Sequence, residues 1–286
     1  MFAIFSSLSH HRRLLRDFVL RDLRARYVGS SMGFFWSVIF PVVNLFVYMF
    51  VFQVVLETRW TPGQTPSEVA LLMLSGIIVW QCFAETISRC TNTLAENQNL
   101  IQKVVFPAEI LPVYLTISAL INMLIGVAIA AIGVAWFAYG AEPDVVASAG
   151  ETGQTIMRPI GLGPSLVTLP ILMVLQAIFT LGLGYFLAAF NLFLRDVYHV
   201  IGVAMSVWMF MTPIFYPAEM VKKAGLSWVL QINPMYWLID SYRKVLIYGV
   251  WPQPLTLGVF AAVAVVAFLL GSRFFLAQKA RFPDLL

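Results

Sequence analysis

Long runs of apolar residues dominate the hydrophobic pattern of this chain. A helix needs about 20 mostly apolar residues to cross the hydrocarbon core of a bilayer, and six runs approach or exceed this length. The predicted spans are residues 34–56, 69–90, 110–139, 166–191, 197–216 and 253–276. Little more than the sequence LFLRD separates the fourth span from the fifth, which predicts a tight turn. The pattern therefore predicts an all-α integral membrane protein, with a single transmembrane domain of six helices over residues 1–286.

The segment 8–28 precedes these spans and has the pattern of an amphipathic helix. Its apolar residues recur near helical spacing, and arginines occupy much of the remainder. The apolar positions are Leu14, Leu15, Phe18, Val19 and Leu23, and the arginines are Arg12, Arg13, Arg16, Arg21 and Arg24. A basic helix with one apolar stripe lies along a membrane surface rather than across it. A segment that served only to set topology would need the charges but not the stripe.

The segment 217–252, between the fifth and sixth spans, is too apolar for an ordinary solvated loop. Pro217, Pro234 and Pro252 divide it into pieces that are too short to cross a membrane. Irregular backbone at membrane depth is tolerated only where protein or a water-filled cavity shields it. We therefore predict a re-entrant helical hairpin that enters from the external face, with two half-length helices around Asn233-Pro234. A pair of amphipathic helices on the outer surface is the alternative.

The distribution of basic residues predicts the orientation of the chain. Six spans place both termini on one side, and that side carries twelve of the 18 Lys and Arg residues. The opposite side carries only Arg59, Arg158, Lys222, Lys223, Arg243 and Lys244. Because Lys and Arg concentrate in cytoplasmic loops, both termini are predicted to be cytoplasmic. Residues 140–165, rich in Gly and Pro, then form an external loop to which we assign no role.

The composition agrees with a membrane protein and excludes a soluble one. Hydrophobic residues make up 60% of the chain and charged residues 11%, whereas a soluble domain is about a quarter charged. The net charge of +4 could indicate a nucleic-acid partner, but the basic residues gather beside the first span, where they set topology. We therefore expect no nucleic acid to bind. Cys82 and Cys90 are separated by roughly 12 Å on one helix, which is too far for a disulfide.

The sequence carries no pattern typical of catalysis or of cofactor binding. No Lys follows a Gly, so the chain has no Walker A sequence for ATP. GxSxG, HExxH and paired-cysteine patterns are also missing, and we expect no catalytic residue, metal site or bound cofactor. Glu85 and Arg89, four residues apart in the second span, predict an intrahelical ion pair, with a cavity-facing role as the alternative. So few charges within the spans disfavour an ion-coupled transporter.

Aromatic residues are abundant, with 23 Phe, 10 Tyr and 8 Trp in the chain. Aromatic belts at the two membrane interfaces account for most residues of this kind in membrane proteins. Aromatic faces can also pack against the C–H faces of sugar rings without any fixed charge. The composition leaves both interpretations open.

Four segments in order carry a resemblance to a known family. They are RDLRARYVGSSMGFFWSVIFPVVNLFVYMFVF at 21–52, IQKVVFPAEILPVYLTISALIN at 101–122, FLRDVYHVIGVAMSVWMFMTPIFYPAEMV at 193–221 and INPMYWLIDSYRKVLIYG at 232–249. The most specific patterns are R-Y-x-x-S-x-x-G-x-x-W from Arg26 to Trp36 and F-P-A-E-x-L-P from Phe106 to Pro112. Nearly the whole chain resembles the membrane-spanning permease of the ABC exporters for O-antigen, capsular polysaccharide and teichoic acid.

This resemblance implies a homodimer that binds two copies of a separate ATPase, which holds ATP and Mg²⁺. It places the chain in the inner membrane of a bacterium, with the amphipathic helix along the cytoplasmic face. The 91–109 loop would contain a coupling helix that docks in a groove on the ATPase, with a second contact from the turn after the fourth span. The implied coupling residues are Asn97, Gln98, Asn99, Leu100, Ile101, Gln102, Lys103, Arg195 and Asp196.

The resemblance also implies a channel along the dimer interface, built mainly from the first and fifth spans. Candidate residues for the channel and its entrance are Arg26, Tyr27, Phe35, Trp36, Tyr48, Phe210, Phe215 and Tyr216. The hairpin at 217–252 would correspond to an external gate. The candidate gate residues are Asn233, Pro234, Tyr236, Trp237, Asp240 and Arg243.

The function expected from the resemblance is export of a lipid-linked polysaccharide such as O-antigen by an ATP-driven transporter. Export of capsular polysaccharide or teichoic acid by the same mechanism is the nearest alternative. An exporter of drugs or lipids is a further alternative within this class. A membrane glycosyl- or acyltransferase would need a cluster of carboxylates or histidines at one interface, and the sequence shows none.

Overall fold

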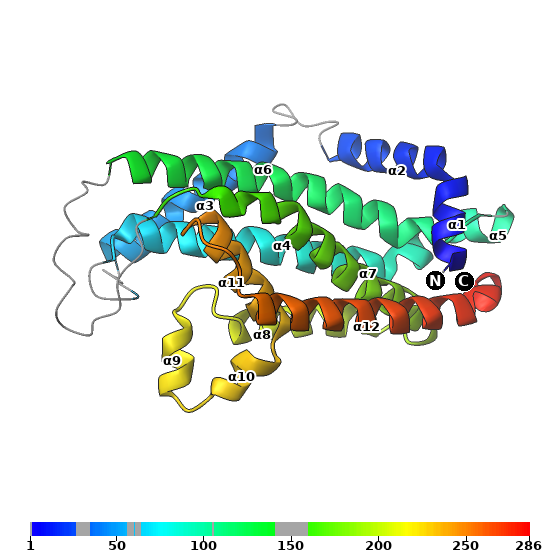
Figure 1. Ribbon diagram of the computed structural model, residues 1–286. Coiled ribbons are helices and arrows are strands. Elements are labelled where there is room, and N and C mark those ends of the chain that lie inside the picture. Colours follow the sequence, from blue (N-terminus) through cyan, green and yellow to red (C-terminus); the bar gives the residue numbers. More distant parts are fainter. Residues whose placement is uncertain (1, 27–34, 56–59, 61–63, 105, 141–159) are drawn as a thin grey trace.

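The computed structural model describes residues 2–26, 35–55, 60, 64–104, 106–140 and 160–286, and these residues form helices and no strands. Long helices lie alongside one another in an elongated bundle (Figure 1). Four of them are long and apolar enough to cross a membrane. They are α4 (Pro66–Glu96), α6 (Ile110–Gly140), α7 (Leu169–Phe193) and α12 (Pro254–Gln278). The second, third, fourth and sixth predicted spans are therefore confirmed by length and hydropathy.

The first and fifth predicted spans correspond to shorter helices. α3 (Phe35–Met49) continues into a π-helical turn, η1 (Phe50–Val55). α8 (Val197–Met211) ends before the predicted limit at 216. Thr212 is extended because it precedes a proline, and the clash with the proline ring disfavours the helical conformation.

α4 extends beyond the predicted boundary at residue 90. α4 continues to Glu96, and α5 (Gln98–Lys103) follows after Asn97. The polar residues after Cys90 do not end α4, and within the continuing helix the Thr91 hydroxyl donates to the Ile87 carbonyl over 2.8 Å. Hydropathy locates where a helix leaves an apolar phase, and a helix can continue beyond that point.

α7 and α12 approach each other closely where a glycine of each helix faces the other helix. A Cβ atom built on Gly271 would lie 1.8 Å from the carbonyl oxygen of Gly182. A Cβ atom on Gly182 would lie 2.4 Å from the carbonyl carbon of Ala267. Small residues permit such close approach of backbones in membrane helices.

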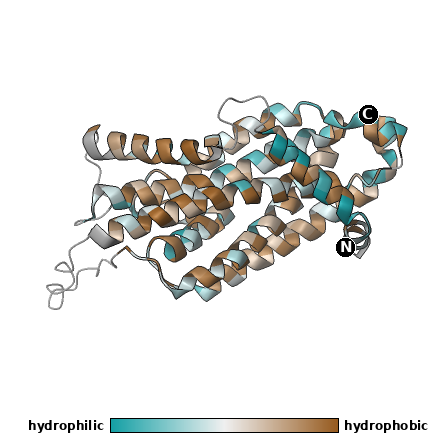
Figure 2. Ribbon diagram, turned by 90° about the horizontal axis from the view of Figure 1, so that it is seen from above, coloured by the Kyte–Doolittle hydropathy of each residue, from teal (hydrophilic) through white to brown (hydrophobic). Residues whose placement is uncertain are grey.

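The amphipathic helix is confirmed as α2 (Arg12–Ala25), which packs across one end of α6. Phe18 and Val19 are buried, and all five arginines of the predicted polar face are exposed. The predicted segment began at residue 8, but a separate helix, α1 (Phe2–His10), precedes α2 at a sharp angle. Both termini lie at this end of the bundle, where hydrophilic residues gather, and the long helices are mostly hydrophobic (Figure 2).

The segment between α8 and α12 contains three helices, namely α9 (Ala218–Lys223), α10 (Ser227–Ile232) and α11 (Pro234–Leu246). The helix break at Asn233-Pro234 is where the sequence predicts it. The sequence did not predict α9, and Gly225, with a φ of 76°, forms the turn between α9 and α10. α11 packs against α4, α7 and α12, whereas α9 and α10 project from the bundle (Figure 1).

Candidate functional site

The predicted coupling residues lie at the end of the bundle that holds both termini. α5 exposes its polar residues and turns its two apolar residues, Leu100 and Ile101, partly into the hydrophobic cluster beneath it. The exposed residues are Gln98, Asn99, Gln102 and Lys103. Asn97 joins α4 to α5, and its side-chain amide donates to the Thr93 carbonyl over 2.8 Å. The short helix thus presents a polar outer face on an apolar support.

The second predicted coupling element, Arg195 and Asp196, is exposed in the turn between α7 and α8. It lies next to the first element. A cavity of about 300 Å³ is lined by Gln98 of α5, by Arg195, and by Leu285 and Leu286 at the end of the described chain. The structure therefore brings both predicted elements to one surface.

A cluster of four charged side chains joins α2 to α4. The Arg26 guanidinium contacts the carboxylates of Asp22, at 3.3 Å, and of Glu85. Arg89 contacts the same two carboxylates, and its distance to Glu85 is 3.4 Å. The predicted pair of Glu85 and Arg89 is confirmed. Asp22 was not predicted, and the signal for it was the presence of two acidic residues, Asp17 and Asp22, on an arginine-rich helix.

The electrostatic environment of Asp22 indicates that the cluster is stable at neutral pH. Burial alone would raise the pKa of this carboxyl group, but hydrogen bonds and charge from Arg89 and Arg26 outweigh that effect and lower it. A lowered pKa in the folded state means that Asp22 contributes stability above its ordinary pKa. That contribution is lost only as the pH falls through the folded-state value.

Replacing Asp22 with Asn should weaken the attachment of α2 to α4, because two guanidinium groups lose a charged partner. We expect a loss of about 1.5–3 kcal/mol, as for hydrogen bonds to charged groups. The measurement is thermal unfolding in detergent at neutral pH. Asp17→Asn is the matched control, since Asp17 is exposed on the same helix. Equal stability of the two variants would contradict a structural role for the cluster.

Two of the candidate channel residues, Arg26 and Trp36, line one cavity of about 290 Å³ between α3, α4 and α6. Its other polar walls are Gln81, Glu85 and Asn122. Amides, a carboxylate, a guanidinium and an indole around one space are groups that can donate to and accept from hydroxyl groups. Tyr27, the neighbouring candidate, lies outside the described residues.

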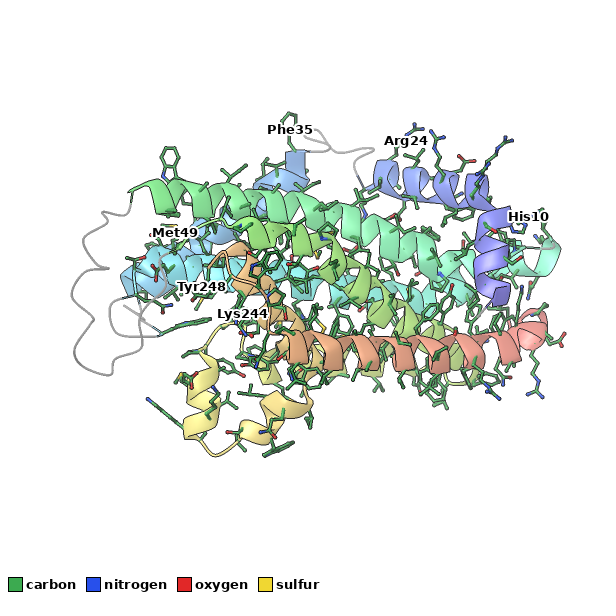
Figure 3. The ribbon with its side chains drawn as sticks, in the orientation of Figure 1. His10, Arg24, Phe35, Met49, Lys244 and Tyr248 are labelled. Carbon is green, nitrogen blue, oxygen red and sulfur yellow. The ribbon has the colours of Figure 1, made fainter. Side chains whose placement is uncertain are left out.

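Four other aromatic candidates gather where α3 and α8 end. The ring of Phe215 lies 6.2 Å from that of Tyr48 and 6.4 Å from that of Phe210. The Tyr216 hydroxyl donates to the Phe210 carbonyl. Phe35 lies apart from this group, is 66% exposed and points away from the bundle (Figure 3). The structure therefore separates the aromatic candidates into one group near the ends of α3 and α8 and two residues, Phe35 and Trp36, at the start of α3.

Asn233, one of the candidate gate residues, connects the start of α11 to α8. Its side-chain oxygen accepts from the Trp208 indole over 3.0 Å and from the backbone N–H groups of Met235 and Tyr236. Its amide donates to the Thr212 hydroxyl over 2.9 Å. Pro234 follows as the first residue of α11, where a missing N–H carries no cost.

Arg243, a second gate candidate, is buried with no carboxylate within ion-pairing distance among the described residues. Its Nε donates to the Leu72 carbonyl over 3.1 Å. Its Nη1 and Nη2 donate to the carbonyls of Pro213 and Ile214 over 2.8 and 2.9 Å. The guanidinium also lies 5.2 Å from the centre of the Trp60 ring. Arg243 thus joins α11 to α4 and to the chain after α8.

The remaining gate candidates, Tyr236, Trp237 and Asp240, are half-buried. Asp240 forms an ion pair with Lys244 over 2.7 Å. A further buried hydrogen bond was not predicted, in which the Tyr242 hydroxyl donates to Gln176 of α7 over 3.0 Å. The signal for it was a glutamine within a predicted span, since polar residues in such segments carry structural or functional roles.

Among the described residues, no group of three or more His, Cys, Asp or Glu side chains could hold a metal ion. Cys82 and Cys90 are both buried and unpaired. The described residues thus form exposed polar surfaces, hydrogen-bonded anchors and a polar-lined cavity.

Comparison with known proteins identifies relatives of the whole chain. The sequence profile of the ABC-2 type transporter family matches residues 18–247. The chain is 28% identical to the O-antigen export system permease protein RfbA of Myxococcus xanthus, over 99% of both chains. It is 27% identical to an RfbA protein of Klebsiella pneumoniae, over 93% of this chain and 92% of the relative. It is 20% identical to the polysialic acid transport protein KpsM of Escherichia coli, over 88% of each chain.

Proposed function

The chain belongs to the ABC-2 type transporter family, and from this premise we propose that it is the membrane-spanning permease subunit of an ATP-driven polysaccharide exporter. The substrate is a lipid-linked polysaccharide such as O-antigen, which moves out of the cytoplasm across a bacterial inner membrane. The observation that carries the proposal is the similarity to an O-antigen export permease over 99% of both chains. The subunit performs no covalent chemistry, and a separate ATPase binds ATP and Mg²⁺.

In this proposal the chain crosses the membrane six times, with both termini in the cytoplasm. α3 and its π-helical turn together supply an unbroken helical stretch from Phe35 to Val55. The length of α8 is only about 22 Å, which is less than the thickness of about 30 Å of the hydrocarbon core of a bilayer. Thr212, Pro213 and Ile214 complete this crossing as buried, non-helical backbone. α11 then re-enters from the external face, and its packing against α4, α7 and α12 supports that position.

The permease functions as a homodimer with the channel along the interface between the two copies. Support comes from α3 and α8, which expose large apolar side chains along much of their length. These include Phe40, Val43, Phe46 and Val47 of α3, and Val203, Val207 and Phe210 of α8. A second copy would cover such faces, and the group around Tyr48 and Phe215 would then border the channel. The cavity at Arg26 and Trp36 would receive the polar part of the substrate at the cytoplasmic side.

Two copies of the ATPase dock on the surface formed by α5 and the Arg195-Asp196 turn. Replacing both Asn99 and Gln102 with Asp should remove the ATPase from the purified complex. These side chains are exposed, so the two new charges enter the interface without disturbing the packing of Leu100 and Ile101. We expect at least a tenfold loss of bound ATPase, equivalent to about 1.4 kcal/mol. The measurement is the ratio of ATPase to permease after purification in mild detergent.

The matched control is Lys222→Asp combined with Lys223→Asp, which changes two exposed residues of α9 at the other end of the molecule. This control should retain the ATPase. A retained ATPase in the α5 variant would disprove the docking surface. A wild-type chain that captures no ATPase, even after cross-linking in intact membranes, would disprove the exporter and favour the glycosyl- or acyltransferase alternative.

Capsular polysaccharide is the second candidate substrate, and the similarity to a polysialic acid transport protein is the observation that favours it. Teichoic acid export remains an alternative within the same mechanism, and drug or lipid export is a more distant one. ATP hydrolysis by the complex in proteoliposomes distinguishes them. Stimulation by a lipid-linked O-antigen, and not by a capsular glycan or by small hydrophobic drugs, is the expected result.

A further inference from the structure

The F-P-A-E-x-L-P pattern takes part in an ion pair that has no role in the proposed function. Its carboxylate, Glu109, is buried and forms an ion pair over 2.7 Å with Lys279, which follows α12. The backbone carbonyl of Glu109 also accepts a hydrogen bond of 2.9 Å from the buried Tyr185. The 279–286 segment, made of η4 (Lys279–Arg281), α13 (Phe282–Leu285) and Leu286, is thereby tied to the start of α6.

The 279–286 segment lies between the two elements that we assign to ATPase docking. α13 contacts α5 on one side and α7 on the other. Phe282 is buried in the cluster on which Leu100 and Ile101 rest, and its ring lies 5.0 Å from that of Phe275. Figure 1 shows the end of the chain and α5 at the same end of the bundle. The segment is therefore continuous with the docking surface.

A groove separates α5 from the 279–286 segment and has a volume of about 410 Å³. Its apolar walls are Ile101, Val104, Phe106, Phe282 and Pro283, and its polar rim is Gln102, Lys103 and Lys279. Lys279 is paired with Glu109, whereas Lys103 forms no ion pair among the described residues. The groove therefore suits an apolar side chain that has a carboxylate beside it.

We propose that the 279–286 segment is a third element of the ATPase-docking surface, and that its groove with α5 receives an apolar side chain of the ATPase next to an acidic one. Glu109 acts as a positioning residue, which holds the wall of the groove through Lys279. This inference rests on the proposed function, because it takes the ATPase as the occupant.

The test places a photo-cross-linking amino acid, p-benzoylphenylalanine, at single positions of the full chain, co-expressed with the ATPase. The positions are Gln102 on one side of the groove and Pro283 on the other, with Lys223 of α9 as the control. Pro283 and Lys223 are both exposed, so neither change disturbs the core. Irradiation of intact membranes should join the ATPase to positions 102 and 283 and not to position 223.

The possible cross-links distinguish a failure of the third docking element from a failure of the exporter proposal. A cross-link to the ATPase from position 102 but not from position 283 would overturn the inference and leave the exporter intact. A cross-link from position 283 to a second copy of this chain, or to lipid alone, would also overturn it. No cross-link from either position, together with no ATPase in the purified complex, would overturn the proposed function itself.

The positioning role of Glu109 has its own test in an exchange of charges. Glu109→Lys and Lys279→Glu should each lower the yield of the cross-link from position 283 by roughly tenfold, equivalent to about 1.4 kcal/mol for each change. The double variant restores the opposite charges and should recover most of the yield. A merely structural role would lower the amount of folded protein without changing the cross-link per folded molecule. Unchanged yields in both single variants would refute the role of Glu109.

Discussion

Replacing Gly271 with alanine should destabilise the bundle, whereas the same replacement at Gly258 of the same helix should have little effect. The new methyl group at position 271 would lie 1.8 Å from the Gly182 carbonyl oxygen, a backbone atom that cannot rotate away. α7 and α12 must therefore separate, and overpacking of this kind costs about 1–3 kcal/mol and occasionally more. No heavy atom lies within 4 Å of a Cβ built on Gly258, so that site accepts the methyl group.

The measurement is thermal unfolding of the two variants and the wild-type chain in one detergent. A fall in stability for the Gly271 variant alone is the expected result. Gly182→Ala provides a second test, because its methyl group would meet the α12 backbone from the other side. If Gly271→Ala and Gly258→Ala unfold at the same temperature, the two helices do not pack as closely as the structure describes. Transport by the Gly258 variant should be unchanged.

The sequence predicted the helices of the bundle well where burial in lipid determines them. The hydropathy of a run reports whether a helix can reside in an apolar phase, so α4, α6, α7 and α12 were predictable. Hydropathy does not report how far a helix continues beyond its apolar run. The predicted end near residue 90 was therefore too early, because α4 continues to Glu96. Short helices such as α9 have too few residues for their periodicity to be recognised.

The candidate site was predictable only in part, because its key contacts join residues that are distant in sequence. Glu85 and Arg89 form a pair within one helix, and their spacing predicted it. Asp22 reaches Arg89 across 67 positions, and Glu109 reaches Lys279 across 170 positions. Such pairs leave no periodic pattern in the sequence. The position of the 279–286 segment beside α5 depends on one of them.

Arg243 was predicted as a gate residue, and its contacts suggest why an arginine stands there. α8 ends at Met211, and the carbonyls of Pro213 and Ile214 lie in the non-helical, buried backbone that follows. Backbone groups at membrane depth must find partners within the protein. The Arg243 guanidinium supplies two of those partners and binds the Leu72 carbonyl as well. Its fork of donors can serve three acceptors at once, which a lysine cannot do in the same geometry.

Replacing Arg243 with Met should therefore detach α11 from the end of α8. The change keeps an apolar stem of similar length but leaves three buried carbonyls without their donors. Each unsatisfied buried group costs about 1–3 kcal/mol, so we expect a large fall in thermal stability and loss of transport. Arg243→Lys should recover part of the stability, since an ammonium group still carries donors. Gly76→Ala should act in the same direction, because its methyl group would lie 2.9 Å from Nη2 of Arg243.

The control for Arg243 is its neighbour Lys244, replaced by Met in the same way. Lys244 pairs with Asp240 where both side chains are about a third exposed, and ion pairs of this kind contribute about 0–1 kcal/mol. Thermal unfolding and glycan transport of the two variants should therefore differ widely. If Arg243→Met is as stable and as active as Lys244→Met, the three carbonyls find other partners. The role of Arg243 as the anchor of α11 would then be wrong.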